Sequence, residues 1–267
     1  MKSRVRKGIP SSLRHEVWQI ICNLKALKAD SHHFYDELIA KEKWVCQDII
    51  ENDVKRTFTT NIYFMQGIGK KSITEILKAV SFAFPTVGYT QGMSFIAGMF
   101  SFYLTNEDSF WMFVYLFEKR NWMMYFQDLA TLDRFSFIFE RLLERYMPKL
   151  LEIMRTVGCD GRLYISKYIT TFFASMLPIS FCVRIFDIFI FENEKIVFRA
   201  LLAIFKILEP HLQNKKSLDG FIGTLSESHR YMGSVTPDSF IEQCLKFTFS
   251  QTELGKLEYE YSFRQKN

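Results

Sequence analysis

Apolar residues recur along this chain at steps of three and four positions, which is the period of an amphipathic helix. Near the N-terminus the pattern is carried by Leu13, Val17, Ile20, Ile21 and Leu24. Comparable patterns cover roughly residues 35–58, 93–104, 109–119, 132–146, 168–176, 179–191, 196–208 and 238–249. We find no convincing alternation of apolar and polar residues that would indicate a strand. The pattern therefore predicts an all-α fold.

Residues that begin and end helices agree with this prediction. Pro10 and Ser11 stand where the first helix should begin. Ser72 and Glu75 have the spacing of a capping box, in which each side chain binds a backbone N–H that the helix leaves unpaired. They predict a helix that begins there and ends near Pro85.

The chain carries no internal repeat and no Gly/Ser-rich linker, so we predict one functional domain over residues 1–267. Pro148, Gly158 and Gly161 interrupt the helical pattern and favour a seam near residues 147–162. We therefore expect two helical lobes, about residues 1–150 and about residues 151–267.

Composition limits the classes of function. The net charge of +5 is spread along the chain, so a nucleic-acid partner is not expected. Five cysteines without a C-x-x-C spacing favour a reducing compartment. The basic N-terminus leads into no apolar stretch, and the apolar runs at residues 93–104 and 109–117 are shorter than the roughly 18 residues that span a bilayer. We expect a cytosolic protein.

One local pattern resembles a phosphate-binding loop but lacks parts of it. Residues 67–72 read Gly-Ile-Gly-Lys-Lys-Ser. A Walker loop needs a further Gly five residues before the Gly of its Gly-Lys pair and a Ser or Thr directly after the Lys, and here those places hold Phe64 and Lys71. A flexible turn before a helix is the better interpretation, so the chain is not expected to bind nucleotide alone.

A metal site and an active site of the chain's own are not supported either. His32, His33, Asp36 and Glu37 could share a helix face, but nothing elsewhere supplies further ligands at a recognisable spacing. No serine or cysteine lies in a nucleophile elbow, and no H-E-x-x-H pattern exists. We therefore predict no metal ligands and no hydrolase activity by the chain itself.

Two further segments have ordinary interpretations when each is taken alone. Asp53 and Arg56 lie three positions apart in a helical pattern, where a surface ion pair contributes only about 0.2 to 0.5 kcal/mol. Residues 87–93, Val-Gly-Tyr-Thr-Gln-Gly-Met, would form a turn that enters a helix, with Gly92 allowing close packing.

In combination, however, these segments resemble the TBC domain family of GTPase-activating proteins for Rab GTPases. Residues 6–18 are similar to the family's R-x-G-[IV]-P-x-x-x-R-x-x-x-W, residues 50–57 to its I-x-x-D-x-x-R-T, and residues 89–93 to its Y-x-Q-G-M. Residues 177–178, 184–187 and 198–201 resemble its second half, so the likeness covers about residues 4–210.

The chain departs from the family's pattern at four positions. Thr59 stands where the family commonly has Pro, and Ser94 where it has Asn. Phe186 and Tyr168 stand where it has Trp. These look like packing or loop positions, so the departures bear on partner choice and local geometry more than on catalysis.

The resemblance implies a two-lobed helical TBC domain with two residues that enter a partner's active site. Arg56 is expected to act as an arginine finger and Gln91 as a glutamine finger. Asp53 is expected to hold Arg56 in place, while Tyr89 and Gly92 shape the loop that presents Gln91.

Three further motif positions are expected to serve the structure. Thr57, directly after the arginine finger, is expected to support the site. Arg14 and Trp18 of the first motif are expected to be structural.

The function that the resemblance implies is activation of GTP hydrolysis by a Rab-type small GTPase in its GTP-bound form. The chain needs no cofactor of its own, because Mg²⁺ and GTP come with the partner. We expect a cytoplasmic protein that the Rab recruits to organelle membranes. Two alternatives remain open, namely a non-catalytic Rab-binding scaffold and a membrane-surface adaptor.

Overall fold

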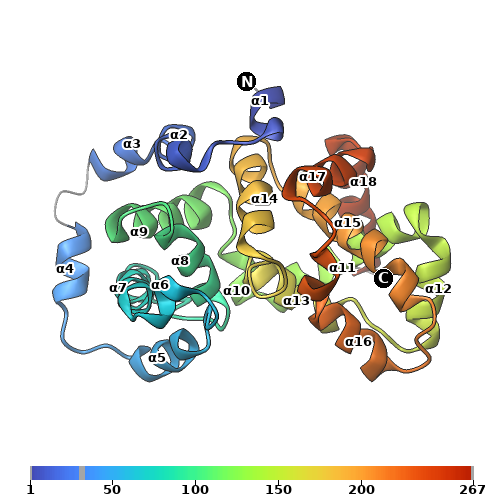
Figure 1. The fold of residues 1–267 in the computed structure, drawn as a ribbon, viewed down its shortest axis with the longest axis horizontal. Coiled ribbons are helices and arrows are strands. Elements are labelled where there is room, and N and C mark those ends of the chain that lie inside the picture. Colours follow the sequence, from blue (N-terminus) through green and yellow to red (C-terminus); the bar gives the residue numbers. More distant parts are fainter. Residues whose placement is uncertain (1, 30–33, 266–267) are drawn as a thin grey trace. The chain divides into compact units, whose positions relative to one another are not determined.

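The computed structural model describes residues 2–29 and 34–265, and within those ranges it contains helices, turns and no strand (Figure 1). The all-α prediction is therefore confirmed. The chain divides into two compact units, unit 1 with residues 1–8, 128–168 and 176–267, and unit 2 with residues 9–127 and 169–175. The expected boundary between lobes lay near residue 150, whereas the chain passes from unit 2 into unit 1 at residue 128.

Unit 2 is built from nine α-helices of the described residues. Their bounds are α2 Arg14–Ile21, α3 Leu24–Ala29, α4 Phe34–Ala40, α5 Gln47–Lys55, α6 Ile62–Met65, α7 Ile68–Ala83, α8 Met93–Ser101, α9 Asn106–Val114 and α10 Met124–Gln127. A 3₁₀ turn, η1 Ser11–Leu13, precedes α2, and a π-helical turn, η2 Tyr115–Lys119, follows α9.

Helix α7 is the centre of unit 2, since α4, α5, α6, α8 and α9 all pack against it. Its apolar stripe Ile73, Ile76, Leu77 and Val80 is completely buried or nearly so, as the sequence pattern indicated. The predicted helix start at Ser72 is wrong. The helix begins at Ile68 because Gly67 takes a left-handed conformation, φ +85°, that ends the preceding turn.

Two other predicted helices differ from the structure. The pattern over residues 35–58 is broken between α4 and α5, where the Trp44 indole N–H donates to the Ser81 hydroxyl at 3.0 Å and turns the chain onto α7. Residues 171–176, predicted as helix, form turns in which Phe172 and Phe173 have φ of 45° and 66° and are completely buried. Burial of these two rings overrides the local helical pattern.

Unit 1 holds α1 and the C-terminal helices. Their bounds are α1 Lys2–Lys7, α11 Leu129–Tyr146, α12 Pro148–Thr156, α13 Arg162–Thr170, α14 Ile179–Phe191, α15 Lys195–Leu212, α16 Leu218–Ser226, η3 Ser228–Met232, α17 Pro237–Lys246 and α18 Gln251–Arg264. The last two residues of α13 belong to unit 2.

Helix α11 organises much of unit 1 by packing against α12, α15 and α18. The Phe135 ring of α11 stacks on Phe198 of α15 with 4.1 Å between the centroids. The seam predicted near residues 147–162 lies inside unit 1. Pro148 begins α12 there, and Gly158, with φ +72°, follows that helix.

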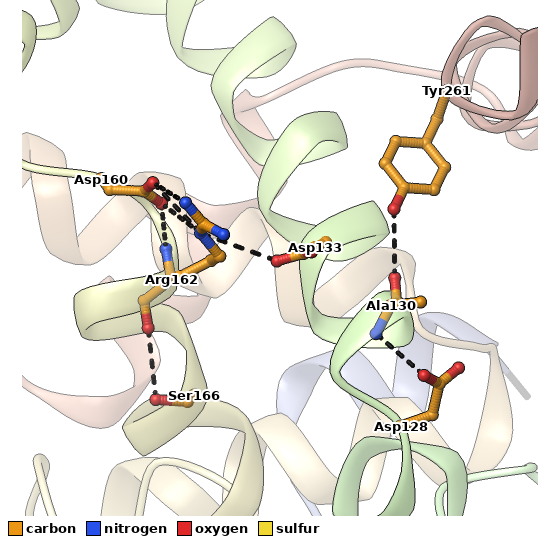
Figure 2. A network of polar contacts seen from close by, with 7 residues as sticks. All are labelled: Asp128, Ala130, Asp133, Asp160, Arg162, Ser166 and Tyr261. Carbon is orange, nitrogen blue, oxygen red and sulfur yellow. Dashed lines mark hydrogen bonds and ion pairs between the residues drawn. The ribbon is translucent and has the colours of Figure 1, made fainter. Parts of the chain in front are cut away.

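Polar contacts fix the start of α11 and of α13, as Figure 2 shows. The Asp128 carboxylate accepts from the Ala130 N–H at 2.8 Å and caps α11, while the Tyr261 hydroxyl donates to the Ala130 carbonyl at 3.4 Å. Before α13, Arg162 pairs with Asp160 at 2.7 Å, and this hydrogen-bonded pair lowers the pKa of Asp160. Both side chains are largely exposed, so the pair contributes little to stability.

No helix in the described part of the chain is both long and apolar enough to cross a membrane.

Candidate functional site

The candidate site begins at the C-terminal end of α5. The helix buries Ile50, Asp53 and Val54, which recur at three- and four-residue steps on the face toward the core of unit 2. Arg56 is the residue that caps the helix at its C-terminus, and its side chain is 57% exposed. The same short helix thus carries one buried carboxylate and one solvent-facing guanidinium.

The buried carboxylate of Asp53 contacts both segments that the sequence singled out. Its Oδ1 accepts from Arg56 Nε at 2.6 Å and also pairs with Arg56 Nη2. Its Oδ2 accepts from the Tyr89 hydroxyl and from the Gly92 N–H, the latter at 3.2 Å. The Asp53 side chain is only 4% exposed, and it therefore binds two residues that lie 36 and 39 positions further along the chain.

Close packing fixes the loop that runs from Gly88 to Gly92. Gly88 has φ +57°, and a Cβ there would lie 3.1 Å from the Cys46 sulfur. Gly92 has φ +106°, and a Cβ there would lie 3.0 Å from Thr171 Cγ2 and 3.1 Å from the Thr170 carbonyl oxygen. Only glycine fits both the conformation and the space at position 92. Gly92 is also the N-terminal cap of α8.

Gln91 lies at the exposed turn of this loop. Its carboxamide makes no hydrogen bond to any residue that the structure describes, so it can bind an external group. Arg56 retains donors as well, since its Nη1 has no partner within residues 2–29 and 34–265. The site therefore presents a permanently charged, planar donor and an uncharged amide on the surface of unit 2.

Tyr89 and Thr57 support the site from inside. Burial, followed by the hydrogen bond to Asp53, raises the pKa of the Tyr89 hydroxyl, which keeps the group protonated as a donor. The Thr57 hydroxyl is completely buried and lies 2.8 Å from both the Asp53 carbonyl oxygen and the Ser94 hydroxyl. Ser94 is on α8, so Thr57 joins the helix of the arginine to the helix that follows the glutamine loop.

Arg14 and Trp18 lie in the core of unit 2. Arg14 is 3% exposed, donates to the Ile9 carbonyl at 2.8 Å and stacks over the Tyr103 ring at 4.8 Å. Trp18 is completely buried and meets Tyr103 edge-on. Their contacts are those of structural residues.

The remaining sequence candidates are residues 32–37 and residues 67–72. No group of three or more potential metal-binding side chains occurs in the described part of the chain, and His32 and His33 fall outside the described ranges. Residues 67–72 form the cap and first turn of α7. A cleft of about 630 Å³ in unit 1, lined by Lys2, Arg6, Lys7 and Arg184 among others, contains none of the predicted site residues.

Sequence reasoning missed three residues that shape the site. In the sequence Ser94 is only a departure from a family pattern, and Thr170 and Thr171 belong to no motif. The glycine at position 92 was the one signal for the last two, because it indicates that another segment approaches closely there.

Comparisons with known proteins agree on one family. The family model described as the Rab-GTPase-TBC domain matches residues 11–213. The chain is 28% identical over 265 residues to the human ecotropic viral integration site 5 protein homolog, covering 98% of this chain and 32% of that protein. It is 31% identical over 232 residues to mouse TBC1 domain family member 10B, covering 85% of this chain and 29% of that protein.

A solved structure shows the same fold. The crystal structure of the Chlamydomonas flagellar RabGAP TBC domain superposes with a TM-score of 0.81 at 22% identity, covering 92% of this chain and 83% of that one. The chain spans about a third of the length of the two curated relatives above.

Proposed function

We propose that this chain, which belongs to the Rab-GTPase-TBC domain family, accelerates GTP hydrolysis by a Rab-type small GTPase and supplies Arg56 and Gln91 to that enzyme's active site. The observation that supports this best is the Asp53 carboxylate, which binds Arg56 directly and binds the backbone next to Gln91 through Gly92. One buried group thereby holds the Arg56 side chain and the backbone next to Gln91 close to each other.

The chemistry of GTP hydrolysis explains why these two residue types are suited to the task. Negative charge develops on the bridging and transferred phosphoryl oxygens, and a planar guanidinium can meet two of them at once. A lysine carries a point charge and cannot do so, which favours Arg56 over its neighbour Lys55. An arginine finger accelerates hydrolysis by about 10³- to 10⁵-fold, equal to roughly 4 to 7 kcal/mol.

Gln91 supplies the second part of the proposal. A carboxamide can accept a hydrogen bond from the attacking water and donate one elsewhere, so it can place the water in line with the γ-phosphate. Residues of this chain bind neither Mg²⁺ nor nucleotide in the proposal, because both are carried by the GTP-bound partner. Recruitment to an organelle membrane through the Rab, and a part in vesicle trafficking, belong to the same proposal.

The test is a panel of GTP-loaded Rab proteins assayed for phosphate release with and without the chain. At least one Rab should be accelerated, and Arg56→Ala should remove about 10³-fold or more of that acceleration. Gln91→Ala should slow hydrolysis with little change in the affinity for the Rab. Lys55→Ala is the matched control, since Lys55 is the adjacent exposed cation and its ammonium donates to the exposed Asn52 side chain at 3.1 Å.

The scaffold alternative predicts a different result. If a Rab binds the chain but is not accelerated, or if Arg56→Ala and Gln91→Ala leave the acceleration intact, the two-finger mechanism is wrong. Strong sedimentation with anionic liposomes in the absence of any Rab would instead favour the membrane-surface adaptor.

A further inference from the structure

Helix α5 carries an exposed apolar stripe that ends at Arg56. Ile49 is 60% exposed and Val45, in the turn that leads into the helix, is 96% exposed. Positions 49 and 56 fall within about 20° of each other at the 100° per residue of an α-helix, and Val45 precedes that helix by two residues. The Ile50 N–H donates to the Cys46 carbonyl at 3.0 Å, so the first hydrogen bond of the helix begins one residue after Val45.

The fold of unit 2 does not require apolar residues on this stripe. The core-facing side of α5 is occupied by Ile50 and Val54, which are 0% and 4% exposed. Single exposed apolar residues are common, but two on the same side of a helix, next to a candidate catalytic arginine, form a surface that a partner can cover. Asn52, between Ile49 and Arg56 on the same helix, is exposed and uncharged, and the Lys55 ammonium donates to its side chain at 3.1 Å.

The loop of Gln91 runs beside this stripe. It lies against the start of α5 where Gly88 meets Cys46, and against the second turn where Tyr89 and Gly92 meet Asp53. The apolar stripe, the arginine and the glutamine loop therefore lie side by side on unit 2, at helix α5, which is at the lower left in Figure 1.

We infer that Val45 and Ile49 contact the GTPase itself, on apolar surface beside its nucleotide-binding site, and provide affinity while Arg56 and Gln91 provide the chemistry. This inference rests on the proposed function. A helix rises about 1.5 Å per residue, so Ile49 lies about 10 Å along the axis from Arg56, and Val45, which precedes the helix, lies farther from it. A standard interface covers roughly 800 Å² of each partner, a disc about 30 Å across.

A GTPase that accepts Arg56 near the centre of its interface must therefore cover Ile49, whereas Val45 lies at its rim. Central positions lose more binding energy on substitution than positions at the rim. Substitutions at Ile49 should consequently weaken the complex more than the same substitutions at Val45.

The test measures KM and kcat separately for the Rab that the wild-type chain accelerates most. Ile49→Asp and Ile49→Ser should each raise KM, the aspartate by about 10-fold or more, while kcat at saturation stays within about 2-fold. Val45→Asp should raise KM by a smaller factor. Arg56→Ala should show the opposite pattern, with a large loss of kcat.

Ile20→Asp is the matched control. Ile20 is 76% exposed on α2, and α2 lies at the other end of unit 2 from α5 in Figure 1. The KM of the Ile20→Asp variant should therefore equal that of the wild-type chain. Because the side chains of Val45, Ile49 and Ile20 are exposed, the melting temperatures of their variants should match. Affinity for the same Rab loaded with a non-hydrolysable GTP analogue should fall in parallel with the rise in KM.

The outcomes separate the two proposals. If the wild-type chain accelerates a Rab and Ile49→Asp keeps the KM of Ile20→Asp, the stripe is not part of the interface although the activity stands. If the wild-type chain accelerates no Rab in the panel, the proposed function and this inference both fail.

Discussion

Replacement of Asp53 by Asn tests whether one buried carboxylate organises the site. The two side chains have nearly the same shape, but asparagine has one acceptor oxygen and one donor group. Asp53 uses Oδ1 for Arg56 and Oδ2 for Tyr89 and Gly92, so the amide must turn its N–H group toward one of these sets of donors. In either orientation the amide N–H group faces another donor. The substitution also removes the negative charge that strengthens every one of these hydrogen bonds.

The expected loss of stability follows from how deeply each hydrogen-bond partner of Asp53 is buried. Gly92 is buried and Tyr89 half-buried, so weakening or losing their two bonds to the carboxylate costs about 1 to 1.5 kcal/mol each. Arg56 is more than half exposed and can turn to water, so its share is at most about 1 kcal/mol. The expected loss is about 2 to 4 kcal/mol of unfolding free energy, or about 5 to 15 °C in melting temperature.

The effect on catalysis should exceed what stability alone explains. Without its partner the Arg56 side chain loses its fixed orientation, and a small misplacement of a catalytic group can cost about 10²-fold in rate. Urea unfolding and phosphate release, both measured below the melting temperature, report the two effects. Asp48→Asn is the control, because it changes the same chemistry in the first turn of α5 and should cost at most about 1 kcal/mol.

The reasoning is refuted if Asp53→Asn unfolds at the same urea concentration as Asp48→Asn and activates the Rab as well as the wild-type chain does. A variant that is less stable but fully active at low temperature would show that Asp53 holds the fold and does not orient Arg56.

Two further predictions concern a glycine and a helix cap. Gly92→Ala should destabilise unit 2 by about 1 to 3 kcal/mol, because φ is +106° and the added Cβ would meet the Thr170 carbonyl at 3.1 Å. Gly223→Ala on α16, where a Cβ meets nothing within 4 Å, should instead stabilise the protein, and thermal melts compare the two. The Ser250 N–H and Arg145 lower the pKa of Glu253 from 4.5 to about 2, so this carboxylate stabilises the fold above pH 4.5 and loses that contribution as the pH falls toward 2. The difference in melting temperature between the wild-type chain and Glu253→Gln should therefore shrink from pH 5 to pH 2, and a constant difference would contradict the assignment.

Helices were predictable where their signal is local. The apolar stripe of α7 sets its buried face through its own spacing, so Ile73, Ile76 and Val80 appear in the core as expected. The start of that helix was not predictable from Ser72, because the left-handed conformation of Gly67 decides it. The turn at Phe172 was not predictable either, because that ring packs on Trp122, far away in the sequence, and periodicity does not record such a contact.

The candidate site was predictable only as a set of positions. By their own chemistry Asp53 and Arg56 indicated no more than a surface ion pair, and resemblance to a family assigned them roles. The bonds of Asp53 to Tyr89 and Gly92, and that of Thr57 to Ser94, join residues nearly 40 positions apart. Such pairs leave no repeating pattern in the chain, so the sequence alone did not indicate them.

Because residues 169–175 belong to unit 2, this unit cannot be completed during synthesis until that segment has been added. Gly92 rests against Thr170 and Thr171, so the ribosome must add 48 residues beyond Gln127 before the last of this segment exists. At about 5 to 20 residues per second that interval is roughly 2 to 10 s. During this time the nascent chain already carries α5 and the loop of Gln91, yet lacks the segment against which that loop packs.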